Sequence, residues 1–359
     1  MHFGTTEEQD LLQATLRRFT SEALPPDRRR ALFEAGPQLD RSLWREAADI
    51  GLAGLMIPEA YGGAGLTLLD QALAGEVLGE SACPGPWLAH ALVGLALSLG
   101  GSEAQRARWL PALASGECIG GVAFGESGDR WEAADWRVAV ESGRVTGTKC
   151  HAHAGDETGL FLVGLAGGRV GLVEADATGL RRRPIEGHDR SRALCDLELE
   201  RTPIELLDAR PGLGEPLLDA ARVLLAADAF GAAWQMIRAS VDYANTREQF
   251  DTKIARFQAV KHQLADMAMA AEPMRGLIWY AAWAFDHRPA ERAREAVTAK
   301  AHVTDGAVRI GRAAVALHGG IGFTWDCDVH LFLKRAMFDR TWLGSPTAHR
   351  ARLACLAAY

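Results

Sequence analysis

The sequence has no pair of cysteines at the spacing of a metal-binding or redox motif. Its 359 residues include six scattered cysteines, which are Cys83, Cys118, Cys150, Cys195, Cys327 and Cys355. Isolated cysteines of this kind are typical of reduced thiols in a cytoplasmic protein. We therefore expect free and mostly buried thiols, a cytoplasmic location and no metal site.

Positive charge and long apolar runs are also scarce. The formal net charge is -7, which disfavours a nucleic-acid-binding surface, and the short basic run Arg181–Arg183 is interpreted as a solvated loop or strand edge. The apolar run Ala89–Leu99 is too short to span a bilayer, and the start MHFGTTEEQD lacks the features of a signal peptide. We expect no nucleic-acid partner and no membrane span.

Neither a GxGxxG motif nor a P-loop is present, so a Rossmann nucleotide site has no support. What is present is a globular composition, with 48% hydrophobic and 24% charged residues. A chain of this length and composition can bury a large core and is compatible with two or three domains.

The periodicity of the apolar residues changes twice along the chain. Helical spacing follows a capping box at Thr6–Gln9 and dominates residues 1–117, short strand-length segments fill residues 118–210, and long helical patterns return in residues 211–359. The sequence predicts a multidomain α+β fold with an N-terminal helical domain, a middle antiparallel β domain and a C-terminal four-helix bundle. The individual segments expected in the last two parts are strands at 120–123, 137–140, 144–147, 160–165, 169–173 and 193–199, and helices at 217–243, 260–271, 274–285, 292–318 and 329–342.

The stretch Tyr243–Val260, YANTREQFDTKIARFQAV, places a cation, an aromatic ring and an amide around one turn between two helices. The planar guanidinium of Arg247 can pair with a pyrophosphate while the ring of Phe250 covers an apolar face, so one interpretation is a dinucleotide clamp. The alternative is a helix hairpin whose arginine pairs with a carboxylate.

Three separated segments together resemble the acyl-CoA dehydrogenase family. They are LWREAADIGLAGLMIPEAYGGAGLTLLD, YANTREQFDTKIARFQAVKHQLADM and LHGGIGFTWDCDVHLFLKRA, in family order and spacing. The resemblance implies non-covalent FAD, a CoA thioester substrate, α,β-dehydrogenation and electron transfer to an electron-transfer flavoprotein. It further implies flavin contacts from the residues that match the family motifs, which are Arg247, Gln249, Phe250, Gln258, His318, Gly319, Gly320, Gly344 and Ser345.

The sequence departs from this family where the chemistry is expected. The usual catalytic glutamate is replaced by Leu343, and the alternative base position before Arg222 is Ala221. Three other flavin contacts change as well: a threonine-glutamate-proline loop becomes Gly125-Glu126-Ser127, a lysine-x-tryptophan strand becomes Lys149-Cys150-His151, and a glutamine of the third signature becomes Ala316. The contacts of the subunit with its own flavin are therefore reduced.

Substitute bases are few. Asp228 lies two turns beyond Ala221 on the same helical face, although a polar group between helices or at an interface has the same pattern. His151 and His153 could titrate near neutral pH, although such a pair is usually surface-polar. Glu126 matches a structural glutamate of the family, and Glu59 is expected to fix its loop.

Three hypotheses remain. The first is a base-lacking subunit of a bacterial heteromeric acyl-CoA dehydrogenase, α2β2 or similar and acting on bulky thioesters such as steroid side chains, in which a homologous partner supplies the base and this chain completes the partner's FAD site. The second is a self-sufficient enzyme with a relocated base. The third is a non-redox acyl-CoA-binding or scaffold subunit.

Overall fold

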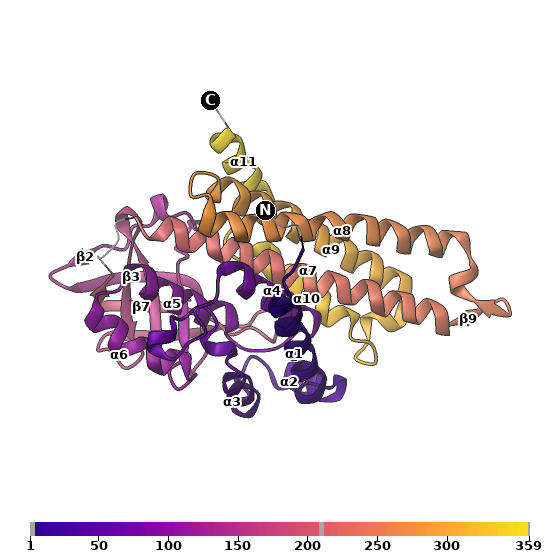
Figure 1. The fold of residues 1–359 in the computed structure, drawn as a ribbon, viewed down its shortest axis with the longest axis horizontal. Coiled ribbons are helices and arrows are strands. Elements are labelled where there is room, and N and C mark those ends of the chain that lie inside the picture. Colours follow the sequence, from indigo (N-terminus) through magenta and orange to yellow (C-terminus); the bar gives the residue numbers. More distant parts are fainter. Residues whose placement is uncertain (1–3, 208–211, 358–359) are drawn as a thin grey trace. The chain divides into compact units, whose positions relative to one another are not determined.

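The computed structural model describes residues 4–207 and 212–357 (Figure 1). Their contacts group into two compact units. We call the described parts of Met1–Ala31, Ala72–Cys83 and Arg222–Tyr359 the helical unit, and those of Leu32–Gln71 and Pro84–Ala221 the sheet unit. The helices and strands together give the helix, sheet, helix order that the sequence predicts, so the fold class is confirmed. The three-domain division stays a prediction, and its boundary between residues 210 and 211 lies outside the described residues.

An eight-stranded sheet forms the centre of the sheet unit. Its strands are β1 (Gly120–Ala123), β2 (Val140–Glu141), β3 (Arg144–His153), β4 (Leu160–Leu165), β5 (Arg169–Glu174), β6 (Leu180–Ile185), β7 (Leu194–Pro203) and β8 (Glu205–Leu206). The strand order is β6-β7-β3-β1-β4-β5-β8, with β2 paired to β3, and each pairing is antiparallel except β1 with β4. All six residues of β4 are buried, as a strand covered on both faces requires.

Two differences from the expected strands have local causes. Residues 137–139 are not in a strand, because the amides of Arg137 and Val138 donate to the Glu126 carboxylate instead of to a neighbouring strand. The basic run Arg181–Arg183 lies in β6, which the sequence identified only as a possible strand edge. Strand β6 is at the edge of the sheet, where Arg181 and Arg183 remain exposed while Arg182 is half-buried.

Three helices of the sheet unit are α3 (Arg41–Asp49), α5 (Trp87–Gly100) and α6 (Glu103–Ala114). Helix α5 packs on β1 so closely that a Cβ at Gly120 would lie 2.7 Å from Val93. His90 on α5 accepts a hydrogen bond from the Gly120 amide at 3.1 Å, so its other ring nitrogen is the donor to the carbonyls of Ala53 and Leu113. Burial lowers the pKa of His90 to about 4, which keeps the ring neutral in this role.

The helical unit contains long helices that run side by side in Figure 1. The remaining helices of the chain are α1 (Glu7–Ala23), α2 (Pro26–Ala35), α4 (Leu68–Glu80), α7 (Gly214–Thr246), α8 (Gln258–His287), α9 (Arg292–His318), α10 (Val329–Thr341) and α11 (Pro346–Ala357). The capping box at Thr6 and Gln9 is formed, and α9 has the bounds that the sequence predicts. Helix α9 packs against α8, α10 and α11.

Proline lies in two of these helices. Pro26 begins α2, because proline is favoured at a first helical position. Two separate helices at 260–271 and 274–285 were expected, but α8 continues through Pro273. The buried residues Met267, Ala271, Met274 and Ile278 lie on one face on both sides of the proline, and this packing outweighs one lost backbone hydrogen bond. Helix α11 was not predicted.

The cysteines are free, as expected, but only Cys83 and Cys195 are buried, so the expectation of mostly buried thiols is wrong. Among the described residues, no group of histidine, cysteine and acidic side chains could hold a metal ion. In the same part of the chain, no helix is both long and apolar enough to cross a membrane.

Candidate functional site

The turn between α7 and α8 is a small β-hairpin. Strands β9 (Glu248–Gln249) and β10 (Thr252–Lys253) pair antiparallel around Phe250 and Asp251, whose φ angles of 55° and 57° are those of a two-residue hairpin turn. The side chain of Phe250 is 88% exposed and meets Phe257 edge to face at 6.1 Å between centroids. An aromatic ring held this far out of the core is available to a partner or ligand.

Arg247 stands at the base of this hairpin. Its amide donates to the Tyr243 carbonyl and its carbonyl accepts from the Ile254 amide at 2.9 Å, so its backbone is fixed on both sides. The guanidinium is exposed, and within residues 4–207 and 212–357 it makes no ion pair. This geometry does not match the alternative in which the arginine pairs with a carboxylate of its own chain. Gln249 and Gln258 are exposed nearby in sequence, Gln258 at the first position of α8.

The end of α9 is tied to the end of α7 by a ring stack. His318 and Tyr243 lie 4.5 Å apart between ring centroids, and His318 Nδ1 donates to the Ala314 carbonyl at 2.8 Å. The following Gly319 has φ 67° and ψ -143°, a conformation that only glycine adopts readily. Gly320 has no atom within 4 Å of the position that a Cβ would take, so this backbone is open to a close approach.

The turn between α10 and α11 contains the position at which the family resemblance predicts a catalytic glutamate. Leu343 at that position is fully buried, with a left-handed φ of 62°, and Gly344 follows with φ 98°. Ser345 Oγ accepts from the Ala348 amide at 3.2 Å and so caps the first turn of α11. Ala221, the other expected base position, is also fully buried. Neither side chain can accept a proton.

Sequence reasoning did not identify the buried basic groups of the helical unit. Lys300 is fully buried and donates to the Asp339 carbonyl in the last turn of α10. Burial lowers the pKa of Lys300 to about 7, and burial together with the charges of Lys300, Arg222 and Arg352 lowers the pKa of His349 to about 2. A single lysine inside a helical pattern gives no sign of burial, which is why these groups were missed.

Asp228 lies inside the helical unit and is paired. Arg335 Nη1 donates to both carboxylate oxygens at 3.1 and 3.2 Å, while Nη2 donates to the Cys83 carbonyl at 3.0 Å. The side chains of Arg335 and Asp228 are 0% and 5% exposed. Both oxygens of the Asp228 carboxylate are thus engaged by a buried cation. The geometry favours the interhelical role that the sequence left open.

The loop Gly125–Ser127 and the strand residues Lys149–His151, which both depart from the family motifs, meet at Glu126. Its carboxylate accepts from the amides of Arg137 and Val138 and from Lys149 Nζ at 2.6 Å. Burial by itself would raise the pKa of Glu126, but the hydrogen bond and the charge of Lys149 lower it. Burial lowers the pKa of Lys149 to about 8 against the opposing effect of Glu126. Glu126 is therefore a structural anchor, as the sequence predicts.

The two histidines of β3 lie in different environments. His151 is exposed at an irregularity of the β3–β7 pairing, with a left-handed φ of 53°, and its amide donates to Asp196 Oδ1 at 3.0 Å. His153 is 1% exposed, against the expectation of a surface-polar pair, because the irregularity turns the strand between them. Glu59 is exposed in the short 3-10 helix Glu59–Tyr61.

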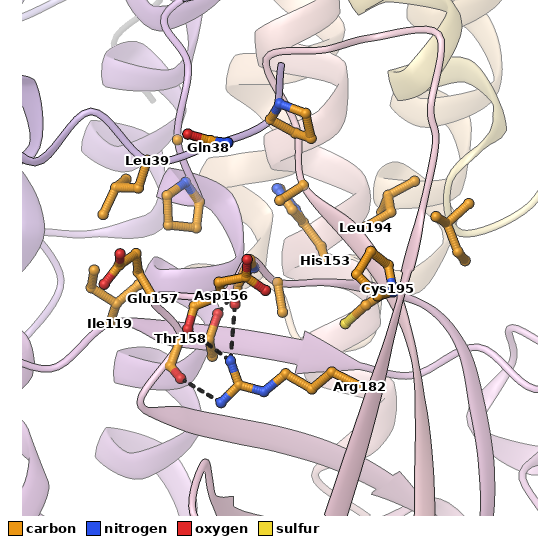
Figure 2. A pocket seen from close by; sticks show the side chains of 18 of the residues that line it. Gln38, Leu39, Ile119, His153, Asp156, Glu157, Thr158, Arg182, Leu194 and Cys195 are labelled. Atoms are coloured by element: carbon orange, nitrogen blue, oxygen red, sulfur yellow. Dashed lines mark hydrogen bonds between the residues drawn. The ribbon is translucent and has the colours of Figure 1, made fainter. Parts of the chain in front are cut away.

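His153 also lines a cavity of about 420 Å³ in the sheet unit (Figure 2). Arg182 extends along one side, where its guanidinium donates to the carbonyls of Asp156 and Thr158 at 2.9 and 3.1 Å. Because these carbonyls engage the guanidinium, the arginine is poorly suited to bind an anion as well. Most of the remaining wall is aliphatic or proline, namely Pro37, Leu39, Pro86, Ile119, Ala154, Pro184, Ile185, Ala193 and Leu194. The cavity is of ligand size, and its aliphatic wall is combined with polar side chains that include Gln38, Glu157 and Ser191.

The chain matches two family models, described as the acyl-CoA dehydrogenase N-terminal domain over residues 6–117 and the acyl-CoA dehydrogenase C-terminal domain over residues 215–355. It is 31% identical over 348 residues to acyl-CoA dehydrogenase IpdE2 of Mycobacterium tuberculosis, covering 97% of this chain and 96% of that protein.

Two solved structures are similar to this chain over nearly its whole length. The Tcur3481-Tcur3483 steroid ACAD G363A variant superimposes with a TM-score of 0.91 at 31% identity, covering 98% of this chain and 97% of that one. The ChsE4-ChsE5 complex from Mycobacterium tuberculosis superimposes with a TM-score of 0.89 at 28% identity, covering 99% and 98%.

Proposed function

Since this chain belongs to the acyl-CoA dehydrogenase family, FAD-binding oxidoreductases that act on CH–CH groups, we propose that it is the base-lacking subunit of a heteromeric enzyme. One observation carries the proposal. Leu343 and Ala221, at the two expected base positions, are buried and aliphatic, while Arg247 stands exposed and without an ion pair in the described part of the chain. In this proposal the chain lacks the base but keeps Arg247 as an outward-facing contact for the nucleotide part of FAD.

The residues of the helical unit fit the pyrophosphate end of FAD. The fork of donors on Arg247 suits a pyrophosphate, and Phe250 offers an uncovered ring beside it. We assign Gln249, Gln258, His318, Gly319 and Gly320 to the same contact, and Gly344 with Ser345 to phosphate at the first turn of α11. FAD, when bound, supplies the hydride acceptor for the dehydrogenation.

In this proposal a homologous partner contributes the proton acceptor and the ring-facing contacts in a cytoplasmic α2β2 complex. The electrons then pass to an electron-transfer flavoprotein. Two of the similar solved structures are named as a steroid ACAD and as a two-component complex, which supports a bulky, steroid-like acyl group and a heteromeric assembly for this chain.

Two alternative functions, a self-sufficient enzyme and a non-redox subunit, require different features of the chain. A self-sufficient enzyme needs a relocated base, and the pairing of Asp228 with Arg335 disfavours the candidate that the sequence offered. A non-redox acyl-binding subunit needs a cavity that holds a ligand without flavin, and the sheet unit contains a ligand-sized cavity with a partly aliphatic wall.

The test is the visible absorption spectrum of the purified chain, expressed alone and together with a homologous subunit. We expect flavin absorbance and acyl-CoA oxidation only from the co-expressed pair. A yellow, fully active homotetramer from this chain alone would reject the heteromeric proposal in favour of the self-sufficient enzyme. A complex that binds acyl-CoA but holds no flavin would favour the non-redox alternative.

Substituting Arg247 by alanine is expected to weaken FAD retention by the complex about 10- to 100-fold, because it removes a charge-assisted contact of about 1.5–3 kcal/mol. Folding should change by less than about 1 kcal/mol, since the guanidinium is exposed. Equilibrium dialysis of FAD against the complex measures the first effect and urea unfolding the second. Arg256→Ala, another exposed arginine of the same connection, is the matched control, and equal losses from the two variants would contradict the assignment.

A further inference from the structure

A tight turn in the sheet unit folds a tryptophan back onto the strand end. The Glu126 amide donates to the Arg130 carbonyl at 3.1 Å, and the Arg130 amide donates to the Glu126 carbonyl at 3.3 Å. Between them, Gly128 and Asp129 have left-handed φ angles of 79° and 59°. This turn reverses the chain within a few residues, so Trp131 returns toward Gly125.

The indole of Trp131 lies directly over Gly125. A Cβ at Gly125 would lie 2.7 Å from Trp131 Cζ3 and 2.6 Å from the Cys150 carbonyl oxygen. A side chain is therefore excluded from position 125 by the indole on one side and by the backbone of β3 on the other. The threonine that the family motif has at position 125 is therefore not only absent from this chain. Its side chain would also have no space there.

Two further contacts fix the indole in this place. Its Nε1 donates to Asp129 Oδ1 at 2.6 Å, within the turn itself. Its ring lies 6.1 Å from the ring of His151, measured between centroids. Gly125 and β3 are joined as well, because the Cys150 amide donates to the Gly125 carbonyl at 2.8 Å. Trp131 thus stands over the altered loop and beside the altered strand.

We propose that Trp131 closes the face of the sheet unit formed by Gly125 and His151, so that this chain cannot accept an isoalloxazine ring there. This inference rests on the proposed function and deepens it. A flat aromatic cofactor stacks on an uncovered surface, and here an indole from the same chain already occupies that surface. Flavin in the complex is then held where the partner provides the ring-facing contacts.

The experiment uses the full-length chain without a partner and titrates it into riboflavin, which carries the isoalloxazine without the nucleotide part. Quenching of riboflavin fluorescence reports binding. The variants are Trp131→Ala, which opens the face, and Trp131→Phe, which keeps a smaller cover. Trp109→Ala is the matched control, because Trp109 is also a half-buried tryptophan of the sheet unit but lies on α6.

We expect Trp131→Ala to bind riboflavin at least about tenfold more tightly than the wild-type chain. Trp131→Phe should fall between them, and Trp109→Ala should match the wild type. No gain in Trp131→Ala overturns the proposal, since something other than the indole then excludes the ring. A loss of binding in Trp131→Ala also overturns it, because the indole would then be a stacking platform for flavin.

The results of this riboflavin titration can be distinguished from the results that test the proposed function. If the co-expressed pair holds flavin and turns over while Trp131→Ala gains nothing, only the closed face is wrong. If the wild-type chain alone is yellow and fully active, both the heteromeric proposal and the closed face are wrong, because the chain then accepts an isoalloxazine ring with the indole in place.

Discussion

Replacing Asp228 by asparagine is expected to lower the free energy of unfolding by about 3 kcal/mol while leaving turnover per bound flavin within about twofold of the wild-type complex. The reason is the burial of Arg335, whose side chain is 0% exposed and whose Nη1 donates to both oxygens of Asp228. A neutral amide cannot compensate that charge. Chemical denaturation measures the stability, and acyl-CoA oxidation by the purified complex measures turnover.

Asp242→Asn is the matched control for this prediction. Asp242 lies on the same helix α7 but is exposed, and its substitution should change stability by less than about 0.5 kcal/mol. Abolished turnover in a folded Asp228→Asn complex that keeps its flavin would assign the base to Asp228. It would thereby restore the hypothesis of a relocated base.

Replacing Lys149 by methionine is expected to destabilise the protein by about 3–5 kcal/mol. The side chain of Lys149 is 0% exposed, and its Nζ donates to Glu126 at 2.6 Å and lies 5.3 Å from the centre of the Trp136 ring. Methionine fills much of the same space but leaves the Glu126 carboxylate buried without its cation. Two backbone amides still donate to that carboxylate, so the loss should not reach the full cost of an isolated buried charge.

The double variant Glu126→Gln with Lys149→Met separates charge from packing. It should recover at least half of the lost stability, because the neutral amide keeps acceptor capacity for the two backbone amides without a buried charge. Lys261→Met on the exposed side of α8 should be nearly neutral. A single Lys149→Met variant as stable as the wild type would show that the pair contributes no net stability.

Local signals in the sequence predicted much of the helical structure. The capping box at Thr6 and Gln9 marks the start of α1, and the glycines after His318 mark the end of α9. Such signals act within one turn of the chain, so they can be recognised without the fold. Pro273 was misleading for the same reason, because the packing that carries α8 through it comes from buried residues on both sides.

The candidate site was predictable only in part. The sequence identified Leu343 and Ala221 as the aliphatic residues at the expected base positions, since these are statements about residue identity. It could not show that Lys300 is buried or that α11 begins at Pro346 after a cap by Ser345. Burial depends on which helices surround a residue, and a periodic pattern does not specify them.

By itself the sequence determined the fold class, the absence of a carboxylate at two positions and the arginine between two helices, because each follows from residue identity or local periodicity. The tertiary structure decided the roles of the polar groups. Arg335 meets Asp228 across 107 positions of sequence, and Trp131 reaches Gly125 only because the chain reverses at Gly128 and Asp129. Contacts of this kind join side chains through space, and their energies depend on burial and distance, which residue order does not specify.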